Sequence, residues 1–226
     1  MKSVLNRRQF FKGALGVVAG LGASHSVLGQ AMDNMCDLTA RQPEGPFYPV
    51  ENQPDKDNDL TQVRGKKDKA KGQILYVFGH ILNENCEPIS GALVEIWQAA
   101  ESGKYNHPSD PNPAPLDPHF QYWGKDVSDE SGKYSFKTII PGNYPAGDGW
   151  IRPSHLHYKV QKRGFFELIT QLYFEGNPYN EKDRILKSLS PQERESVIVK
   201  LIPPLDWMEK DAKQCIFNVT LRGVPR

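Results

Sequence analysis

The stretch that decides the fold reads QILYVFGHI (residues 73–81), NENCEPISG (83–91) and ALVEIWQ (92–98). The first and third segments are rich in β-branched and aromatic residues and alternate in character, as half-buried strands do. The segment between them carries the Asn, Pro and Gly residues of a turn. Two strands joined by a turn predict a β-sheet protein.

The rest of the chain continues as short strand-like runs separated by long loops. The runs cover residues 133–140, 155–160, 168–174 and 215–222, and the longest loop, with five prolines, covers residues 99–124. Only one helix is indicated, because Ser190, Pro191 and Glu193 provide an N-cap, a first-turn proline and a capping-box acid in order. We predict an all-β fold, an antiparallel β-sandwich with long irregular loops and one short helix in the C-terminal half.

Residues 1–31 are predicted to be a signal for export and not part of the fold. They contain NRRQFFK (residues 6–12), a twin-arginine signal, followed by an apolar, Gly/Ala-rich run over residues 14–28. That run is too short to span a membrane. We expect residues 32–226 to form a single domain that is periplasmic or secreted, with no membrane span in its mature form.

Charge argues against a nucleic-acid partner. The formal net charge of the whole chain is +1. The signal holds four basic residues and no acidic one, so its removal lowers the net charge by four, to about −3. A chain without a basic surplus provides no attractive field for phosphates, and we expect no nucleic-acid binding.

The three cysteines, Cys36, Cys86 and Cys215, leave at least one thiol outside any intramolecular pair. Cys215 shares one side of a strand-like run with Phe217 and Val219, so we interpret it as a small buried hydrophobic residue. Cys36 and Cys86 lie in loop-like segments and can form a bridge in an oxidising compartment. The sequence alone establishes no pair.

Two histidines in one strand-like run, His155 and His157, are the strongest chemical signal in the chain. Residues two apart in a strand point to the same side, so both imidazoles can bind one metal ion. Tyr144, in PGNYP (residues 141–145), precedes them and can supply a phenolate oxygen. Neutral nitrogens with anionic oxygens favour trivalent iron. The alternative, a zinc or copper site, needs a third histidine. Its candidates are His80, His107 and His119.

Seven short motifs, in a fixed order, carry a family resemblance. They are VEIWQA (94–99), GKY (103–105), APLDP (114–118), GKYSF (132–136), PGNYP (141–145), RPSHLH (152–157) and TQLYFEG (170–176). Over roughly residues 40–224 the chain resembles the intradiol ring-cleavage dioxygenases, most closely the protocatechuate 3,4-dioxygenase branch.

The resemblance implies a non-haem Fe(III) ion and names the residues around it. The implied ligands are Tyr105, Tyr144, His155 and His157. Arg152 and Gln171 match the arginine and the glutamine beside the iron. Arg152 is expected to stabilise negative charge that develops on the substrate, and Tyr144 is expected to accept a substrate proton.

The implied reaction cleaves a catechol-type ring between its two hydroxylated carbons with O2, and gives a cis,cis-muconate. We expect a small aromatic diol as substrate, with a protocatechuate-like compound favoured. EGPFY (residues 44–48) resembles the family's N-terminal segment that lines the substrate pocket. A tryptophan common in the family is replaced by Ala146, which alters the pocket wall. The resemblance also implies a homo-oligomer or an assembly with a related chain.

A non-catalytic function is the alternative from another class. The run over residues 79–97 is typical of transthyretin-like β-sandwich modules, which bind partners. Colour discriminates between the two hypotheses, because a ferric-tyrosinate protein absorbs visible light and a binding module does not.

Overall fold

The computed structural model describes residues 35–53 and 55–225. In its first sheet, each of the other strands pairs with β1 (Ile74–Asn83). It pairs antiparallel with β4 (Lys133–Ile139) on one side. On its other side it pairs in parallel with β10 (Lys213–Ile216) and then with β11 (Val219–Leu221). The run predicted over residues 215–222 is therefore two strands.

Gly79 allows the segment between β10 and β11 to approach β1 closely. The N–H of Phe217, in that segment, donates to the carbonyl oxygen of Phe78 at 2.8 Å. A Cβ atom at position 79 would lie 1.9 Å from the carbonyl oxygen of Phe217, so only glycine fits there. The backbone N–H of His80 then donates to the side chain of Asn218 at 3.0 Å.

The second sheet has five strands in the order β3-β2-β7-β8-β9. They are β3 (Trp123–Val127), β2 (Leu93–Trp97), β7 (His155–Gln161), β8 (Leu168–Phe174) and β9 (Ile198–Val199). All neighbours are antiparallel except β8 and β9. The predicted β-sandwich is confirmed, but its sheets are mixed, because crossover segments return the chain to β1 and β8 in the same direction.

The core lies between the two sheets and fixes which face of β7 is free for chemistry. Leu156, Tyr158 and Val160 are fully buried in the core cluster. Side chains alternate along a strand, so His155 and His157 lie on the opposite face. Cys215 is a buried free thiol in the same core, as predicted, and burial raises its pKa to about 12.

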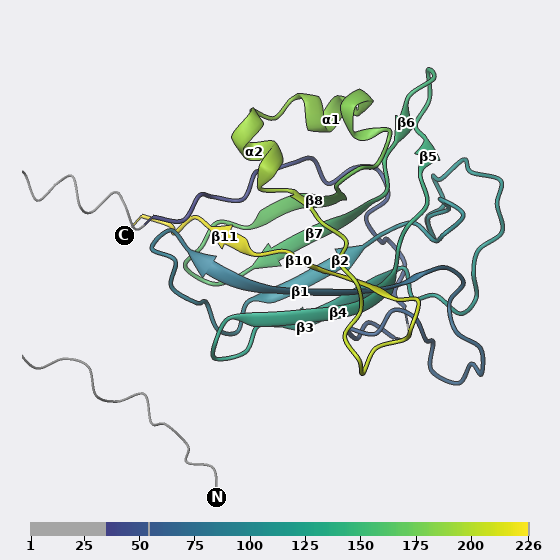
Figure 1. The fold of residues 1–226 in the computed structure, drawn as a ribbon, viewed down its shortest axis with the longest axis horizontal. Coiled ribbons are helices and arrows are strands. Elements are labelled where there is room, and N and C mark those ends of the chain that lie inside the picture. The colour runs from purple at the N-terminus through teal and green to yellow at the C-terminus, as the bar shows by residue number, and fades with distance from the viewer. Residues whose placement is uncertain (1–34, 54, 226) are drawn as a thin grey trace, which may run out of the picture. The chain divides into compact units, whose positions relative to one another are not determined.

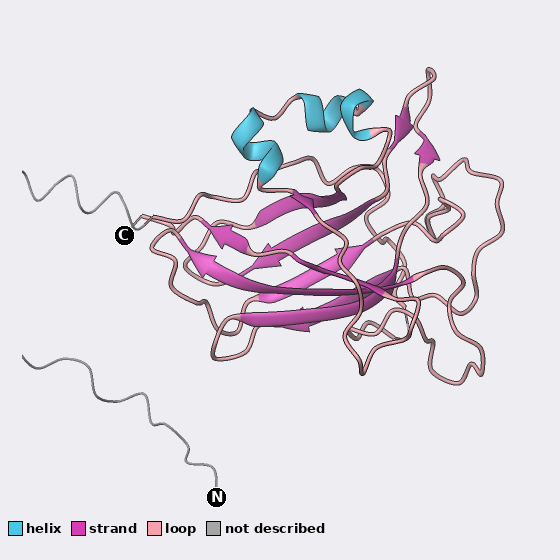
Figure 2. Cartoon of the chain, in the orientation of Figure 1, coloured by secondary structure: helices cyan, strands magenta, loops and turns pink. Residues whose placement is uncertain are grey.

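Short helices lie beside β8, as Figure 2 shows. The predicted helix is confirmed as α2 (Pro191–Glu195), with the complete capping box between Ser190 and Glu193. The structure adds a four-residue helix, α1 (Arg184–Lys187), preceded by a 3-10 turn (Asn180–Lys182). The prediction of a single helix was wrong because α1 is too short for a hydrophobic period.

A projecting hairpin lies at one end of the sandwich, where the long loops gather (Figure 1). Its strands are β5 (Tyr144–Pro145) and β6 (Ile151–Arg152), which pair antiparallel. The sequence did not predict these strands, since each has only two residues. The long loop predicted over residues 99–124 is irregular up to Trp123, where β3 begins.

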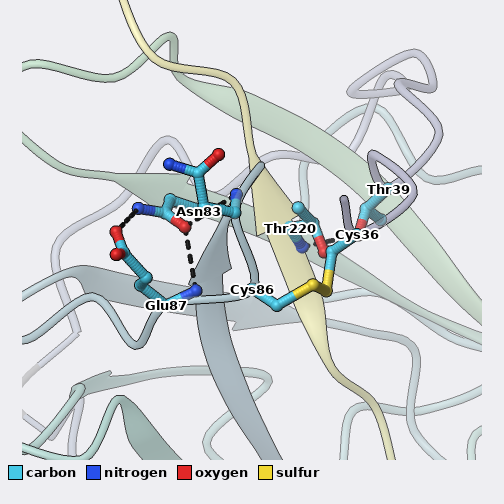
Figure 3. The surroundings of a disulfide bond; sticks show 7 residues. Cys36, Thr39, Asn83, Cys86, Glu87 and Thr220 are labelled. Carbon is cyan, nitrogen blue, oxygen red and sulfur yellow. Dashed lines mark hydrogen bonds between the residues drawn. A yellow bond between two sulfur atoms is a disulfide. The ribbon is translucent and has the colours of Figure 1, made fainter. Parts of the chain in front are cut away.

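A disulfide joins Cys36 to Cys86 and ties the N-terminal segment to the turn between β1 and β2. Figure 3 shows this turn, in which Asn83 accepts hydrogen bonds from the backbone N–H groups of Asn85 and Glu87. The bridge closes a loop of 50 residues in sequence. The predicted export signal lies outside the described residues. In the part of the chain that the structure describes, none of the helices has the length and apolar character of a membrane span.

Candidate metal centre

Strand register brings the predicted site together on the outer face of the second sheet. Trp97 of β2 and Gln171 of β8 both pair with His157 of β7, and Tyr173 pairs with His155. Residues opposite each other in neighbouring antiparallel strands have adjacent side chains. The two histidines are each 2% exposed, because loops cover this face of the sheet.

The two imidazoles converge through their Nε2 atoms, which lie 3.2 Å apart. His155 Nδ1 lies 2.6 Å from the carbonyl oxygen of Pro153, so Nδ1 carries the proton and Nε2 presents a lone pair. His157 stacks on Trp97, with ring centroids 4.7 Å apart and planes inclined by 10°. Both rings are therefore fixed in orientation before any ligand binds.

Two tyrosines join the imidazoles from segments outside the sheet. Tyr105 lies at the start of the long loop, and its hydroxyl is 3.3 Å from His155 Nε2. The loop is held there by Asp110, which accepts from the backbone N–H of Tyr105 at 2.6 Å. Tyr144, on β5, has its ring 5.4 Å from that of Tyr105 and 5.7 Å from that of His155.

This donor set fits a metal ion. Metal–nitrogen bonds of about 2.1 Å hold neighbouring donors about 3 Å apart, as the Nε2 atoms and the Tyr105 hydroxyl are here. His157 Nδ1 is buried without a partner among the described residues, which agrees with a ring oriented through its other nitrogen. Within the described part of the chain, no group of three His, Cys, Asp or Glu side chains is arranged to hold a metal ion, so an ion here requires the phenols.

The alternative zinc or copper site would need a third histidine beside His155 and His157. His107 lies beside Phe47, with ring centroids 5.7 Å apart, and His119 lies 3.9 Å from Asp68. His80 lies on β1, in the other sheet. Among the described residues the structure therefore brings no third histidine to the pair.

The imidazoles are neutral and the phenols hold their protons in the metal-free chain. Burial, together with the charge of Arg152, lowers the pKa of both His155 and His157 well below 6.5. Burial raises the pKa of Tyr105 well above 10. Burial also raises the pKa of Tyr144, although the charge of Arg152 opposes part of that rise. A bound cation would reverse the preference of the phenols by stabilising phenolate.

Arg152 is buried beside the donors and forms the centre of a hydrogen-bond network. Its Nε donates to Asp183 at 2.8 Å, and its Nη2 donates to Gln171 Oε1 at 2.6 Å and to the Tyr173 hydroxyl at 3.1 Å. Burial opposes the charge of Arg152, yet the pKa of Arg152 lies above its ordinary value, and the Asp183 carboxylate is among the groups that raise it. Gln171 is turned toward Arg152 by this network and anchors the N-terminal segment through Pro43.

A covering segment, residues 36–48, closes the site from above β8. Gln42 donates to Thr170 at 3.2 Å and accepts from the Tyr173 hydroxyl at 2.9 Å. Gly45 has φ +76°, and a Cβ atom there would lie 3.3 Å from the His157 ring. Phe47 packs on Tyr105, with ring centroids 4.7 Å apart. Within residues 44–48, which are expected to line the substrate pocket, Gly45 lies beside His157 and Phe47 lies against Tyr105.

The structure thus brings all six predicted residues into one cluster and adds others that sequence reasoning missed. The additions are Gln42, Trp97, Tyr173 and Asp183. Tyr173 could have been found from the sequence, because it stands two residues after Gln171 in the same strand-like run and so shares its face. Asp183 gave no signal, because its contact with Arg152 spans 31 residues without periodicity.

Known proteins share this chain's sequence pattern and fold. A family model described as Dioxygenase matches residues 43–223. The chain is 36% identical to the protocatechuate 3,4-dioxygenase beta chain of Burkholderia cepacia, over 81% of this chain and 79% of that one. It is 32% identical to catechol 1,2-dioxygenase 2 of Acinetobacter lwoffii, over 74% of this chain and 64% of that one. The solved intradiol ring-cleavage dioxygenase from Tetranychus urticae superposes with a TM-score of 0.64 at 26% identity, covering 84% and 97% of the respective chains.

These matches, together with the site geometry, define the class: the chain belongs to the intradiol ring-cleavage dioxygenase family. The family typically uses non-haem Fe(III), and its enzymes are oxidoreductases. The relative from Burkholderia cepacia is named as a beta chain.

Proposed function

We propose that this protein is an Fe(III) dioxygenase that cleaves a catechol-type ring between its hydroxylated carbons, consuming O2 and giving a cis,cis-muconate-type product. The observation that carries the proposal is the convergence of two neutral imidazoles with two buried phenols. Tyr105, Tyr144, His155 and His157 would hold the ion. When bound, ferric iron would supply the Lewis acidity that ionises the diol and makes its ring reactive toward O2.

The chain's own residues have separate tasks in this reaction. Tyr144 Oη would accept a proton from one substrate hydroxyl, since burial makes its protonated form favourable. Arg152 lies beside Tyr144 and would stabilise the negative charge that develops on the ring. Gln171, bound to Arg152, would help to hold that guanidinium in place. The covering segment packs against His157 and Tyr105 and would help to exclude water, which strengthens electrostatic interactions in the site.

We further propose an acidic catechol, protocatechuate-like, as the favoured substrate. A cation next to the site hairpin supports this choice. The exposed Arg184 guanidinium lies 5.1 Å from the ring centroid of Trp150, and Arg152 lies 5.3 Å from the same ring. An exposed arginine beside this hairpin would be able to pair with a substrate carboxylate. The relative from Burkholderia cepacia is named for activity on protocatechuate.

Export by the twin-arginine route and a periplasmic or secreted location are also proposed. The Cys36–Cys86 bridge supports an oxidising compartment. Assembly with itself or with a related chain is proposed from the resemblance to a beta chain. Loading of the metal before export is compatible with a pathway that carries folded proteins.

One experiment tests the proposed function directly. The purified protein is loaded with ferric iron, its metal content is measured, and it is incubated under O2 with protocatechuate, catechol and hydroxyquinol. We expect one iron per chain, a visible phenolate-to-iron band and muconate-type products. A colourless protein that binds no iron would favour the non-catalytic β-sandwich module, and semialdehyde products would contradict cleavage between the hydroxylated carbons.

A further inference from the structure

The carboxylate of Asp183 serves two partners at once. One oxygen, Oδ2, accepts from Arg152 Nε at 2.8 Å. The other, Oδ1, accepts from the backbone N–H groups of Ile185 and Leu186 and so caps helix α1. Asp183 is fully buried, and its partner Arg152 is 3% exposed. We infer that Asp183 is the positioning residue that holds Arg152 in its working orientation, an inference that rests on the proposed ring-cleavage reaction.

The geometry around Arg152 supports a positioning role. A guanidinium has five N–H groups in one rigid plane. Asp183 holds the Nε–H, while Gln171 and Tyr173 hold the Nη2 group. Tyr144, a predicted metal ligand, is the register partner of Arg152 across the hairpin and interacts with its charge. Fixing one edge of the plane therefore determines how the rest of the guanidinium faces the site.

Because Arg152 is buried, its orientation depends on the carboxylate of Asp183. A buried guanidinium without an opposite charge moves toward water or another anion, because desolvation of an unpaired charge is costly. The nearby polar partners, Gln171 and Tyr173, are neutral and cannot replace that charge. We expect Arg152 to lose its orientation when Asp183 is neutral, even where the sandwich is intact.

The two carboxylate oxygens of Asp183 have different partners, so a substitution that changes only one of them can separate its two roles. An asparagine side chain at position 183 would have one acceptor oxygen and one amide donor, so it could cap α1 or accept from Arg152, but not both. Asparagine is a good N-cap, so Asp183→Asn is expected to retain α1 and to place its NH2 group against the Arg152 Nε–H. The substitution therefore separates the role toward Arg152 from the role toward the helix.

The test measures Arg152 directly and then measures turnover. In metal-free protein, the Arg152 Nε–H proton is expected to give a protected nitrogen-15 correlated NMR signal that Asp183→Asn abolishes. In iron-loaded protein, kcat is expected to fall about a hundredfold, with KM changed far less, since loss of orientation acts on the reacting complex. If Asp183→Asn does not fold, Asp183→Ser, which keeps a capping oxygen, takes its place.

A double-mutant cycle and a matched cap variant complete the design. In an Arg152→Ala background, Asp183→Asn should change kcat no further, because its target is gone. Ser190→Ala removes the N-cap of α2, which does not contact Arg152, and should lower thermal stability while leaving kcat unchanged. An unchanged kcat in Asp183→Asn, a persistent Nε–H signal, or an equal effect in both backgrounds would overturn the inference.

The proposed function fails on a different result. If the wild-type protein takes up iron but cleaves no catechol, the proposed ring-cleavage function is contradicted before any variant is made. The positioning role fails only when variants of an active protein do not respond as described.

Discussion

Tyr144 and Arg152 are register partners across the β5–β6 hairpin, so a phenol and a guanidinium of the site are placed by the same pair of two-residue strands. Seven residues of the chain lie between them, yet they lie opposite each other. The hairpin tip between them is exposed, and a Cβ atom added at Gly147 or Gly149 would meet nothing within 4 Å. The site therefore depends on the length of this hairpin more than on its tip residues.

Replacing Tyr105 with phenylalanine should remove much of the visible absorption of the iron-loaded protein. The phenolate oxygen is lost while the ring keeps its contacts with Phe47 and Tyr144. Turnover should fall at least about tenfold. The spectrum and the iron content of each preparation check the prediction. Tyr158→Phe, in the core, is the control and should leave the colour intact; colour retained in Tyr105→Phe would remove that residue from the ligand set.

Replacing Arg152 with lysine should keep a positive charge in the site but lose the planar contacts to Gln171 and Tyr173. We expect iron binding to persist and kcat to fall by about 10²–10³. Iron content and single-turnover kinetics measure the two properties separately. Arg194→Lys, in an exposed ion pair with Glu181, is the matched control. Wild-type turnover in Arg152→Lys would reduce Arg152 to a structural partner of Asp183.

Replacing Gly45 with alanine should disturb the His157 ring, which a new Cβ atom would meet at 3.3 Å. Gly65 has the similar φ of +81°, with nothing within 4 Å, so Gly65→Ala carries the same backbone strain without the contact. Each variant should lose about 1 kcal/mol of stability. Only Gly45→Ala should also shift the visible spectrum and lower turnover; equal behaviour of the two would show that the covering segment adapts.

Acid should destabilise the metal-free protein. The pKa of His155 and that of His157 lie well below 6.5 in the folded chain, mainly because of burial, and rise to about 6.5 on unfolding. The unfolded state therefore binds more protons below pH 6.5, and stability falls as the pH decreases from there. Each histidine contributes a slope of about 1.4 kcal/mol per pH unit. Denaturant unfolding between pH 7.5 and 5 measures it, and His155→Asn should halve the slope that the pair produces.

Removing the disulfide with Cys36→Ser and Cys86→Ser should cost about 4 kcal/mol in the chain-entropy description of a 50-residue loop. The loss should also loosen the covering segment, since that segment begins at Cys36. Thermal unfolding and proteolysis near residues 36–48 measure the two effects. Cys215→Ala, in the core, is the control and should leave the proteolytic pattern unchanged. A pattern unaffected by loss of the bridge would assign the order of this segment to its contacts with β8 alone.

The parts of the structure that follow from local pattern could be predicted from the sequence. Alternation identified β1, β2, β7 and β8, and capping chemistry identified α2. Motif resemblance grouped the six site residues, although periodicity alone supports only the histidine pair. The sequence pattern did not predict β5 and β6, because a strand of two residues is too short to show alternation. It did not predict the parallel pairing of β1 either, because pairing over a long sequence separation leaves no local signal.

The polar network behind the site was also beyond prediction. Asp148 is the acidic residue nearest to Arg152 in sequence, but the acidic partner of Arg152 is Asp183. Asp148 lies in the exposed hairpin tip with φ 51°, whereas Asp183 begins a helix that packs beside β8. The choice between them is made by tertiary packing, which brings the start of α1 to the base of the hairpin.

The alternation along β7 sets a rule for how this protein can change over evolutionary time. Core side chains and imidazoles alternate along this strand. Gain or loss of one codon there would turn core side chains toward the site and imidazoles toward the core, and both stability and chemistry would be lost. Insertions in the loop over residues 99–122 leave that parity untouched. Variation in length, and with it divergence among descendants, is therefore expected to accumulate in the loop while the strand keeps its count.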